Sequence, residues 1–415
     1  MTDRKGNPGR QRSNRYNQTL LFLTMFIIVV GFGVIMPTFP YYAENMGATA
    51  TDLGLLTGMY AGLQFVFAPI WGRVSDRWGR KPVMLLGLFG FTLTFAGFGL
   101  STELWMLFVS RGISGFITSA TLPAVMAYIA DTTDHENRGN GMSLLGSAMG
   151  LGTIFGPVIG GFLGEFSAST PFFFSAFLAL GVGIFAWVFL PESLSPEMRA
   201  LSRTSTKHTN PFLDVFRLLG APVGLLMILA LLTSFGMAQM ESTSALFYED
   251  QIQATGSDLG IIFMVMGAVS FATQFLLVGR SIRHLGEQKT FIWSLAGVVV
   301  SFLMFSLIRS MISALTAVVV MGFFSSFFRP ALNTMLSNRT SAAEQGVTLG
   351  VINSYYSLGR MIGPVTGGII FDHLGIHMPF YFAALITLVS LALAAIFFQR
   401  KSLTGLSEIP ETAGE

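Results

Sequence analysis

Twelve long apolar stretches, separated by shorter polar segments, make up most of the 415-residue chain. A helix that crosses a membrane needs about 20 predominantly apolar residues, and each stretch is about that long. We therefore expect an all-α membrane protein with twelve transmembrane helices. The expected spans are residues 19–42, 53–71, 82–100, 104–129, 142–163, 171–190, 222–247, 259–278, 290–308, 312–336, 347–371 and 378–398.

The polar segment 191–218 divides these stretches into six and six. Short motifs of the first half recur in the second at a nearly constant separation, which predicts two pseudo-symmetric six-helix bundles. We expect the bundles at residues 1–190 and 219–415, with 191–218 as a cytoplasmic linker. The recurring pairs are Gly72-Arg73 with Gly279-Arg280, Pro123-Ala124 with Pro330-Ala331, Gly156-Pro157 with Gly363-Pro364, Gly160-Gly161 with Gly367-Gly368, and Asp52-Leu53-Gly54 with Asp258-Leu259-Gly260.

Composition narrows the class of protein further. Hydrophobic residues make up 52% of the chain and charged residues 11%, against about 25% charged residues in a soluble domain. The absence of cysteine excludes disulfides and thiolate metal sites, and a net charge of +2 is too small to indicate a nucleic-acid partner. No phosphate-binding Gly-x-x-x-x-Gly-Lys-Ser/Thr sequence occurs, and the five histidines lack metal-ligand spacing. We expect neither an enzyme nor a bound metal or cofactor.

The distribution of Lys and Arg predicts the orientation. These residues gather before the first stretch, at 72–81, in the central polar segment and after the eighth stretch. Loops rich in Lys and Arg stay in the cytoplasm, so we expect both termini to be cytoplasmic. The apolar run after Met1–Asn17 is too long for a signal-peptide core, and we interpret it as a retained first span.

The segment Gly72–Lys81 is a strongly basic turn with one carboxylate between two apolar stretches. Its glycines permit a tight turn, and Asp76 can pair with a neighbouring arginine. The spacing of its residues resembles the signature loop between the second and third helices of the major facilitator superfamily. The resemblance implies a conformational role for Gly72, Asp76, Arg77, Gly79 and Arg80, with Asp76 holding cytoplasmic helix ends together when the cavity opens outward.

A column of glycines follows in the fifth stretch, at Gly152, Gly156, Gly160 and Gly164. Such a face lets helix backbones approach closely, and we expect it to pack against a helix of the other half. The run Gly156, Pro157, Gly160 and Gly161 resembles the motif of proton-coupled exporters in the superfamily, although Ser143 replaces an earlier glycine of that pattern.

Four charged residues lie well inside the expected spans, namely Arg111, Glu241, Arg329 and Arg360. An intramembrane charge costs about 2.5–3.5 kcal/mol even on a lenient scale, so each marks either a water-filled cavity or a static buried ion pair. Small and polar residues share their helix faces, which favours a cavity. The arrangement Arg111-x-x-x-Gly115 resembles the family's fourth-span motif, which implies that Arg111 assists proton transfer. Glu241 is the only carboxylate well inside an expected span, so we expect it to be the main proton-coupling residue.

Aromatic and methionine side chains next to Glu241 suit a lipophilic cation, because ring faces attract cations and Met is adaptable. The candidate substrate cavity comprises Gln64, Phe235, Met237, Met240, Glu241, Arg329, Asn333, Asn353, Tyr356 and Arg360.

The resemblance covers nearly the whole chain. It implies a monomeric drug/proton antiporter of a bacterial plasma (inner) membrane, similar to bacterial multidrug and tetracycline exporters, whose partners are small lipophilic substrates, protons and the bilayer. Ser326 stands where related exporters carry a second acidic residue, which gives Glu241 more weight. Three alternatives remain open: a tetracycline-specific exporter, a dedicated transporter of one metabolite such as a sugar, and a non-transporting membrane receptor.

Overall fold

The computed structural model describes residues 8–133, 138–195, 197, 199, 223–340 and 345–403. Over these ranges the regular elements are all helices, which confirms the predicted all-α class. Ten helical segments are long and apolar enough to cross a membrane, and Leu21–Ile35 adds a shorter apolar segment. Of the predicted linker, only 191–195, 197 and 199 lie within the described residues.

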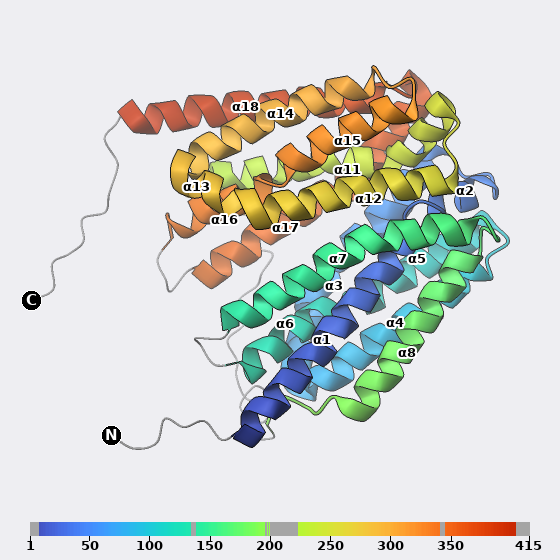
Figure 1. Ribbon diagram of the computed structural model, residues 1–415, viewed down its shortest axis with the longest axis vertical. Helices are drawn as coiled ribbons and strands as arrows, with labels where there is room; N and C mark the ends of the chain where they lie inside the picture. The colour runs from blue at the N-terminus through green and yellow to red at the C-terminus, as the bar shows by residue number, and fades with distance from the viewer. Residues whose placement is uncertain are drawn as a thin grey trace, which may run out of the picture.

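The helices form two bundles, which we call the N half and the C half (Figure 1). The N half comprises α1 (Pro8–Ile35), α2 (Phe39–Glu44), α3 (Ala50–Trp78), α4 (Arg80–Gly99), α5 (Leu104–Thr118), α6 (Thr121–Thr132), α7 (Arg138–Gly164) and α8 (Thr170–Phe189). The C half comprises α11 (Gly224–Ile252), α12 (Gly256–Thr273), the π-helical turn η1 (Gln274–Val278), α13 (Gly279–Leu285), α14 (Glu287–Phe305), α15 (Met311–Ser325), α16 (Phe328–Ser337), α17 (Gln345–Leu374) and α18 (Met378–Leu403).

Three expected spans are interrupted: 19–42 is divided between α1 and α2, and two others are divided at equivalent places in the repeat. The stretch 104–129 is divided between α5 and α6, and 312–336 between α15 and α16. Pro123 and Pro330 follow the breaks closely. Proline has no N–H for the carbonyl four residues earlier and clashes with it. Those carbonyls belong to Ser119 and Ser326, the C-cap residues directly after α5 and α15.

The basic segment Gly72–Lys81 is more helical than expected. α3 continues through Trp78 and α4 begins at Arg80, so Gly79 alone stands between them, with φ of +116°. A single left-handed glycine turns the chain where a longer loop was predicted. Arg280 and Arg283 likewise lie on the helix α13, and the prediction of a loop there was wrong.

The two halves meet mainly through two helix pairs, α3 with α17 and α7 with α12, and α11 also contacts α2 and α3. Both crossings need glycine. A Cβ atom on Gly54 would lie 2.3 Å from the carbonyl oxygen of Pro364, and one on Gly260 would lie 2.8 Å from that of Pro157. Since these two contacts join equivalent residues of the repeat, the interface between the halves is itself pseudo-symmetric.

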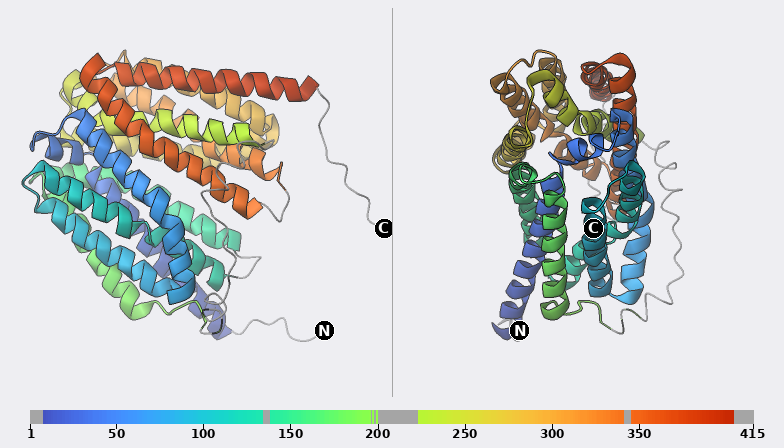
Figure 2. Two further views of the ribbon diagram at one scale, coloured as in Figure 1. Left: turned by 180° about the vertical axis from the view of Figure 1, so that it is seen from behind. Right: turned by 90° about the vertical axis from the view of Figure 1, so that its right-hand side faces the viewer.

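These contacts gather at one end of the molecule, which we call the α2 end. It holds α2, the first residues of α3 and α12, and the last residues of α7 and α17. In Figure 2 (left) the ribbons of α3 and α17 lie together there and diverge toward the opposite end, which we call the Gly79 end. Among the described residues, the halves thus contact each other from the α2 end to about the middle of the helices, where Gly62 faces Met361 and Gly150 faces Phe271.

Candidate functional site

A cavity of about 450 Å³ lies between the two halves. Its walls come mostly from α1, α3 and α4 of the N half, with further residues from α2, α5, α6 and α7. The C half contributes five residues from α11 and α17: Ala238, Glu241, Ser242, Arg360 and Pro364. The cavity therefore has an extensive N-half wall and a small, charged C-half wall.

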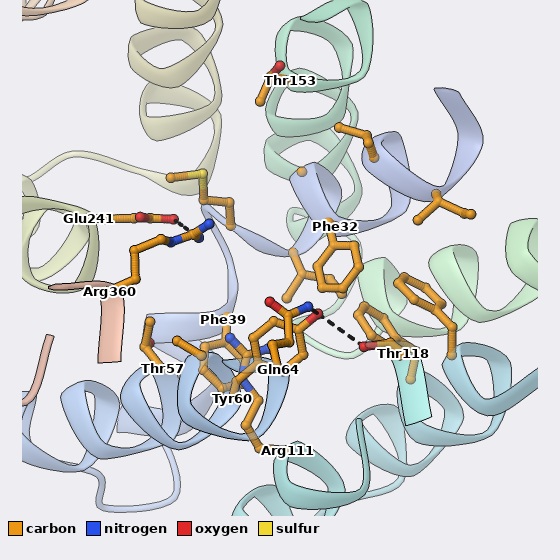
Figure 3. A pocket seen from close by; sticks show the side chains of 18 of the residues that line it. Phe32, Phe39, Thr57, Tyr60, Gln64, Arg111, Thr118, Thr153, Glu241 and Arg360 are labelled. Atoms are coloured by element: carbon orange, nitrogen blue, oxygen red, sulfur yellow. Dashed lines mark hydrogen bonds and ion pairs between the residues drawn. The ribbon is translucent and has the colours of Figure 1, made fainter. Parts of the chain in front are cut away.

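An ion pair forms the charged wall. Arg360 Nη2 lies 3.5 Å from Glu241 Oε1, and the two side chains are 56% and 41% exposed (Figure 3). Their helices can approach because glycines face α11: a Cβ atom on Gly359 or Gly363 would lie 2.6 Å from a backbone oxygen of that helix. A half-exposed pair is worth only about 0–1 kcal/mol, so another cation can displace Arg360 at small cost.

Arg111 points into the cavity from α5 and is covered by aromatic rings. Its guanidinium carbon lies 4.5 Å from the ring centre of Tyr60 and 5.2 Å from that of Phe39, both within cation–π range. Gly115 lets α5 approach α3, since a Cβ atom there would lie 3.2 Å from the carbonyl oxygen of Tyr60. Figure 3 shows Arg111 and Tyr60 side by side.

A hydrogen-bonded chain extends from the same tyrosine. Gln64 Nε2 donates to the Tyr60 hydroxyl at 2.9 Å, and that hydroxyl lies 3.1 Å from Thr118 Oγ1. The Thr118 hydroxyl donates in turn to the Ser114 carbonyl at 2.7 Å. Such a network fixes the ring that covers Arg111 and leaves the Gln64 side-chain oxygen as an acceptor at the cavity wall.

Aromatic side chains that the sequence analysis did not single out build the N-half wall. The Phe32 ring packs edge-on against Phe91 at 4.9 Å and Phe95 at 5.6 Å, and lies 5.8 Å from the Tyr60 ring. Edge-to-face pairs hold rings in defined orientations. The signal that could have located this wall is Gln64, an uncharged polar residue inside the second expected span.

The predicted aromatic and methionine wall on α11 does not line this cavity. Met240 is 3% exposed and belongs to the core of the C half, Met237 packs against the same core, and the Phe235 ring lies 6.4 Å from that of Phe382. Residues 238, 241 and 242 share the cavity face because they are three and four positions apart. Met240 lies on another side of α11, inside the core of the C half, and Met237, although four positions before Glu241, packs against that core instead of lining the cavity, so their prediction as cavity residues was wrong.

Four other predicted residues form a separate cluster on α16 and α17. Arg329 Nη2 donates to Asn353 Oδ1 at 2.9 Å, and its guanidinium carbon lies 4.7 Å from the ring centre of Tyr356. Asn333 lies one turn after Arg329 on α16. This cluster is not among the residues that line the 450 Å³ cavity.

The predicted conformational motif is held within the N half. Arg80 is 9% exposed and donates from Nε to Asp131 Oδ2 at 3.0 Å and from Nη1 to Asp76 and to Ser75 Oγ. Glu192 accepts the backbone N–H of Arg80 at 2.9 Å and so caps α4. Gly72 and Arg77 also belong to α3, with Arg77 exposed. A locking role across the halves remains a prediction.

The glycine column of α7 packs differently from the expectation. A Cβ atom on Gly156 would lie 2.7 Å from Gly33 Cα, and Gly152 and Gly160 likewise face α1, a helix of the same half. Pro157 and Gly161 are the ones that contact α12 of the C half. The prediction that this column faces the other half was wrong, because the inter-half face is offset by one residue.

Comparison with known proteins agrees with this architecture. The model of the Major Facilitator Superfamily matches residues 21–364 and 242–413. Multidrug resistance protein 2 of Bacillus subtilis is 33% identical over 387 residues, covering 92% of this chain and 95% of the relative. Quinolone resistance protein NorA of Staphylococcus aureus is 27% identical, covering 92% and 97%.

Solved structures share the fold. A nucleoside transporter superposes with a TM-score of 0.78 at 14% identity, over 92% of this chain and all of that one (100%). A human organic anion transporter superposes with a TM-score of 0.69 at 23% identity, over 94% and 100%.

Proposed function

The chain belongs to the major facilitator superfamily, and on that premise we propose that it exports lipophilic, often cationic, drugs in exchange for protons. The single observation that carries the proposal is the half-exposed Glu241–Arg360 pair in an aromatic-walled cavity between the two halves. Relatives named for multidrug and quinolone resistance support the substrate class. We propose that it works as a monomer in a bacterial plasma membrane and catalyses no enzymatic reaction.

The distribution of Lys and Arg indicates which end of the molecule faces the cytoplasm. Arg73, Arg77 and Lys81 on one half and Arg280 and Arg283 on the other lie at the Gly79 end. Cytoplasmic loops carry the excess of Lys and Arg. We therefore assign the Gly79 end and both termini to the cytoplasm, and the α2 end to the exterior. The conformation described here is then closed outside, and transport requires a second conformation closed inside.

Coupling rests on competition for one carboxylate. The Glu241 carboxylate can hold Arg360, a drug cation or a proton, and each excludes the others from the same oxygens. A cation that enters from the cytoplasm displaces Arg360 and binds against the ring wall. A proton that enters from the exterior removes the negative charge and releases the drug. The exchange needs only that the two conformations differ in their affinity for drug and proton.

Arg111 adds a fixed positive charge to the same cavity. Its ring cover keeps it at the wall, where its charge repels a second cation or a proton. We propose that Arg111 thereby assists proton release from Glu241. The N-half rings provide the adaptable apolar contact area that lipophilic molecules of different shape require.

The test measures protons released when tetraphenylphosphonium is added to the purified transporter in weakly buffered detergent solution. The parent should release protons, and Glu241→Gln, which keeps size but cannot ionise, should release almost none. Glu249→Gln is the matched control, because Glu249 lies on the same helix outside the cavity lining. Undiminished release by Glu241→Gln would refute Glu241 as the coupling residue. An absence of cation binding by the parent would refute the substrate class.

A further inference from the structure

At the α2 end, two acidic residues each accept hydrogen bonds from the opposite half. Asp372 on α17 accepts hydrogen bonds from the backbone N–H of Ala50 at 3.1 Å, the N–H of Thr51 at 2.8 Å and the Thr51 hydroxyl at 2.5 Å. Glu165, directly after α7, accepts a short hydrogen bond from the Ser257 hydroxyl on α12. Each acid thus reaches the first turn of a helix in the opposite half.

The two contacts are equivalent under the internal repeat. Glu165 and Asp372 each lie one turn after the second glycine of a Gly-Gly pair, and Thr51 and Ser257 are each the second residue of their helix. The glycines make the same approach as well. A Cβ atom on Gly161 would lie 2.6 Å from the oxygen of Gly256, and one on Gly368 would lie 2.2 Å from that of Ala50.

The receiving helices are already capped from within their own half. Thr49 with Asp52 and Thr255 with Asp258 form capping boxes at the starts of α3 and α12. Folding of either half therefore does not require the acid from the other half. The acid adds a charge-assisted bond at the positive end of the helix dipole, and this bond exists only while the two halves touch at the α2 end.

A bond present in one conformation and absent in the other shifts the equilibrium between them. We infer that Asp372 and Glu165 form a pair of outer latches that stabilise the externally closed conformation and thereby set the balance of alternating access. Asp372 is the stronger latch, because it accepts three hydrogen bonds and Glu165 accepts one. The inference rests on the proposed alternating-access function.

The test measures distances across both ends of the molecule with pairs of spin labels. Because the chain has no cysteine, labels attach only where cysteine is introduced. The pair Thr102→Cys and Asp250→Cys, both exposed positions, reports on the α2 end, and Val188→Cys with Leu285→Cys reports on the Gly79 end. Labelled parent, Asp372→Asn, Glu165→Gln and the double variant are compared without substrate.

Asp372→Asn should raise the ratio of externally open to externally closed molecules about tenfold, in the range of one charged hydrogen bond. Glu165→Gln should raise it less, and the double variant more than either. Label distances should lengthen at the α2 end and shorten at the Gly79 end together. Thr51→Val and Ser257→Ala, which leave the acids in place and remove the hydroxyl donors, should shift the ratio in the same direction.

Glu103→Gln is the control, since it neutralises an exposed carboxylate before α5 at the same end. Distance distributions of Asp372→Asn and the double variant that match the parent would overturn the latches. If Asp372→Asn does not fold, Thr51→Val tests the same contact from the donor side. Ser257→Ala does so for Glu165→Gln. Because no drug is present, this result is independent of the proton-release test, and either proposal can fail alone.

Discussion

Glu241 and Arg360 pair across two helices of the C half, 3.5 Å apart, and both side chains face a wall built almost wholly by the N half. The arginine occupies the position that a cationic ligand would take. Binding of such a ligand is therefore an exchange of partners at one carboxylate. This exchange predicts the effect of removing the arginine.

Arg360→Gln should bind lipophilic cations more tightly, because the ligand no longer has to displace a guanidinium. An exposed pair is worth about 0.2–1 kcal/mol, so the dissociation constant should fall about 1.4- to fivefold. Calorimetric titration with tetraphenylphosphonium measures the change. Arg329→Gln serves as the control, since Arg329 bonds to Asn353 away from the cavity lining. Weaker binding by Arg360→Gln alone would mean that Arg360 contacts the ligand rather than competing with it.

Substitutions of Tyr60 separate its two contacts. Tyr60→Phe keeps the ring over Arg111 and loses the bonds to Gln64 and Thr118, whereas Tyr60→Leu loses the ring as well. A cation–π contact contributes about 0.5–2 kcal/mol, so Tyr60→Leu should reduce proton-driven dye efflux the more strongly of the two. Efflux rates at equal expression in a pump-deficient host give the comparison. Equal losses would show that the hydroxyl network, and not the ring, is what transport needs.

The two carboxylates that bind Arg80 should have different roles, Asp131 in stability and Asp76 in the rate of transport. The Arg80 side chain is 10% exposed and that of Asp131 25%, whereas the Asp76 side chain is 45% exposed. Asp131→Asn leaves a buried guanidinium short of a charged partner and should lower the free energy of unfolding by about 1–3 kcal/mol. Asp76→Asn should leave stability nearly unchanged and slow turnover. Thermal unfolding in detergent and reconstituted drug uptake measure the two effects, and the reverse pattern would refute this assignment.

Adjacent faces of α7 should respond differently to the same substitution. Gly156→Leu forces a side chain against Gly33 inside the N half and should lower the unfolding temperature or prevent insertion. Gly161→Leu forces one against the start of α12 and should leave the N half intact while it opens the α2 end. Thermal unfolding and the spin-label pair at that end distinguish them. An unchanged label distance in a folded Gly161→Leu variant would contradict the inter-half role.

The bundle and its charged centre could be predicted from the sequence because both leave strong signals. Apolar runs reveal the spans, and a charge such as Glu241 or Arg111 inside a span is too costly to be incidental. The aromatic wall leaves no such signal. Phe32 faces the cavity and Phe275 is exposed on the outer surface, yet both lie in uniformly apolar stretches. Hydrophobic periodicity cannot orient a helix whose lipid face and cavity face are both apolar.

The predictions that were wrong failed because the sequence does not define how each helix is rotated about its own axis. Met240 directly precedes Glu241 in sequence but points into the core of the C half, and Met237 packs against the same core. The glycine column of α7 was correctly interpreted as a close-contact face, but its partner, α1 or α12, depends on a shift of one residue. Sequence spacing gives the contact type, and only tertiary packing assigns the neighbour.

The unequal contribution of the two halves to the cavity has a genetic consequence. The cavity wall that would meet the drug is mainly N-half side chains, whereas the ion pair that would exchange the proton belongs to the C half. Selection for altered drug preference should therefore recover substitutions in α1, α3 and α4. Selection for growth under a changed proton gradient should recover them in α11 and α17. Recognition and energy conversion would then be separable traits, each inherited from a different copy of the ancestral repeat.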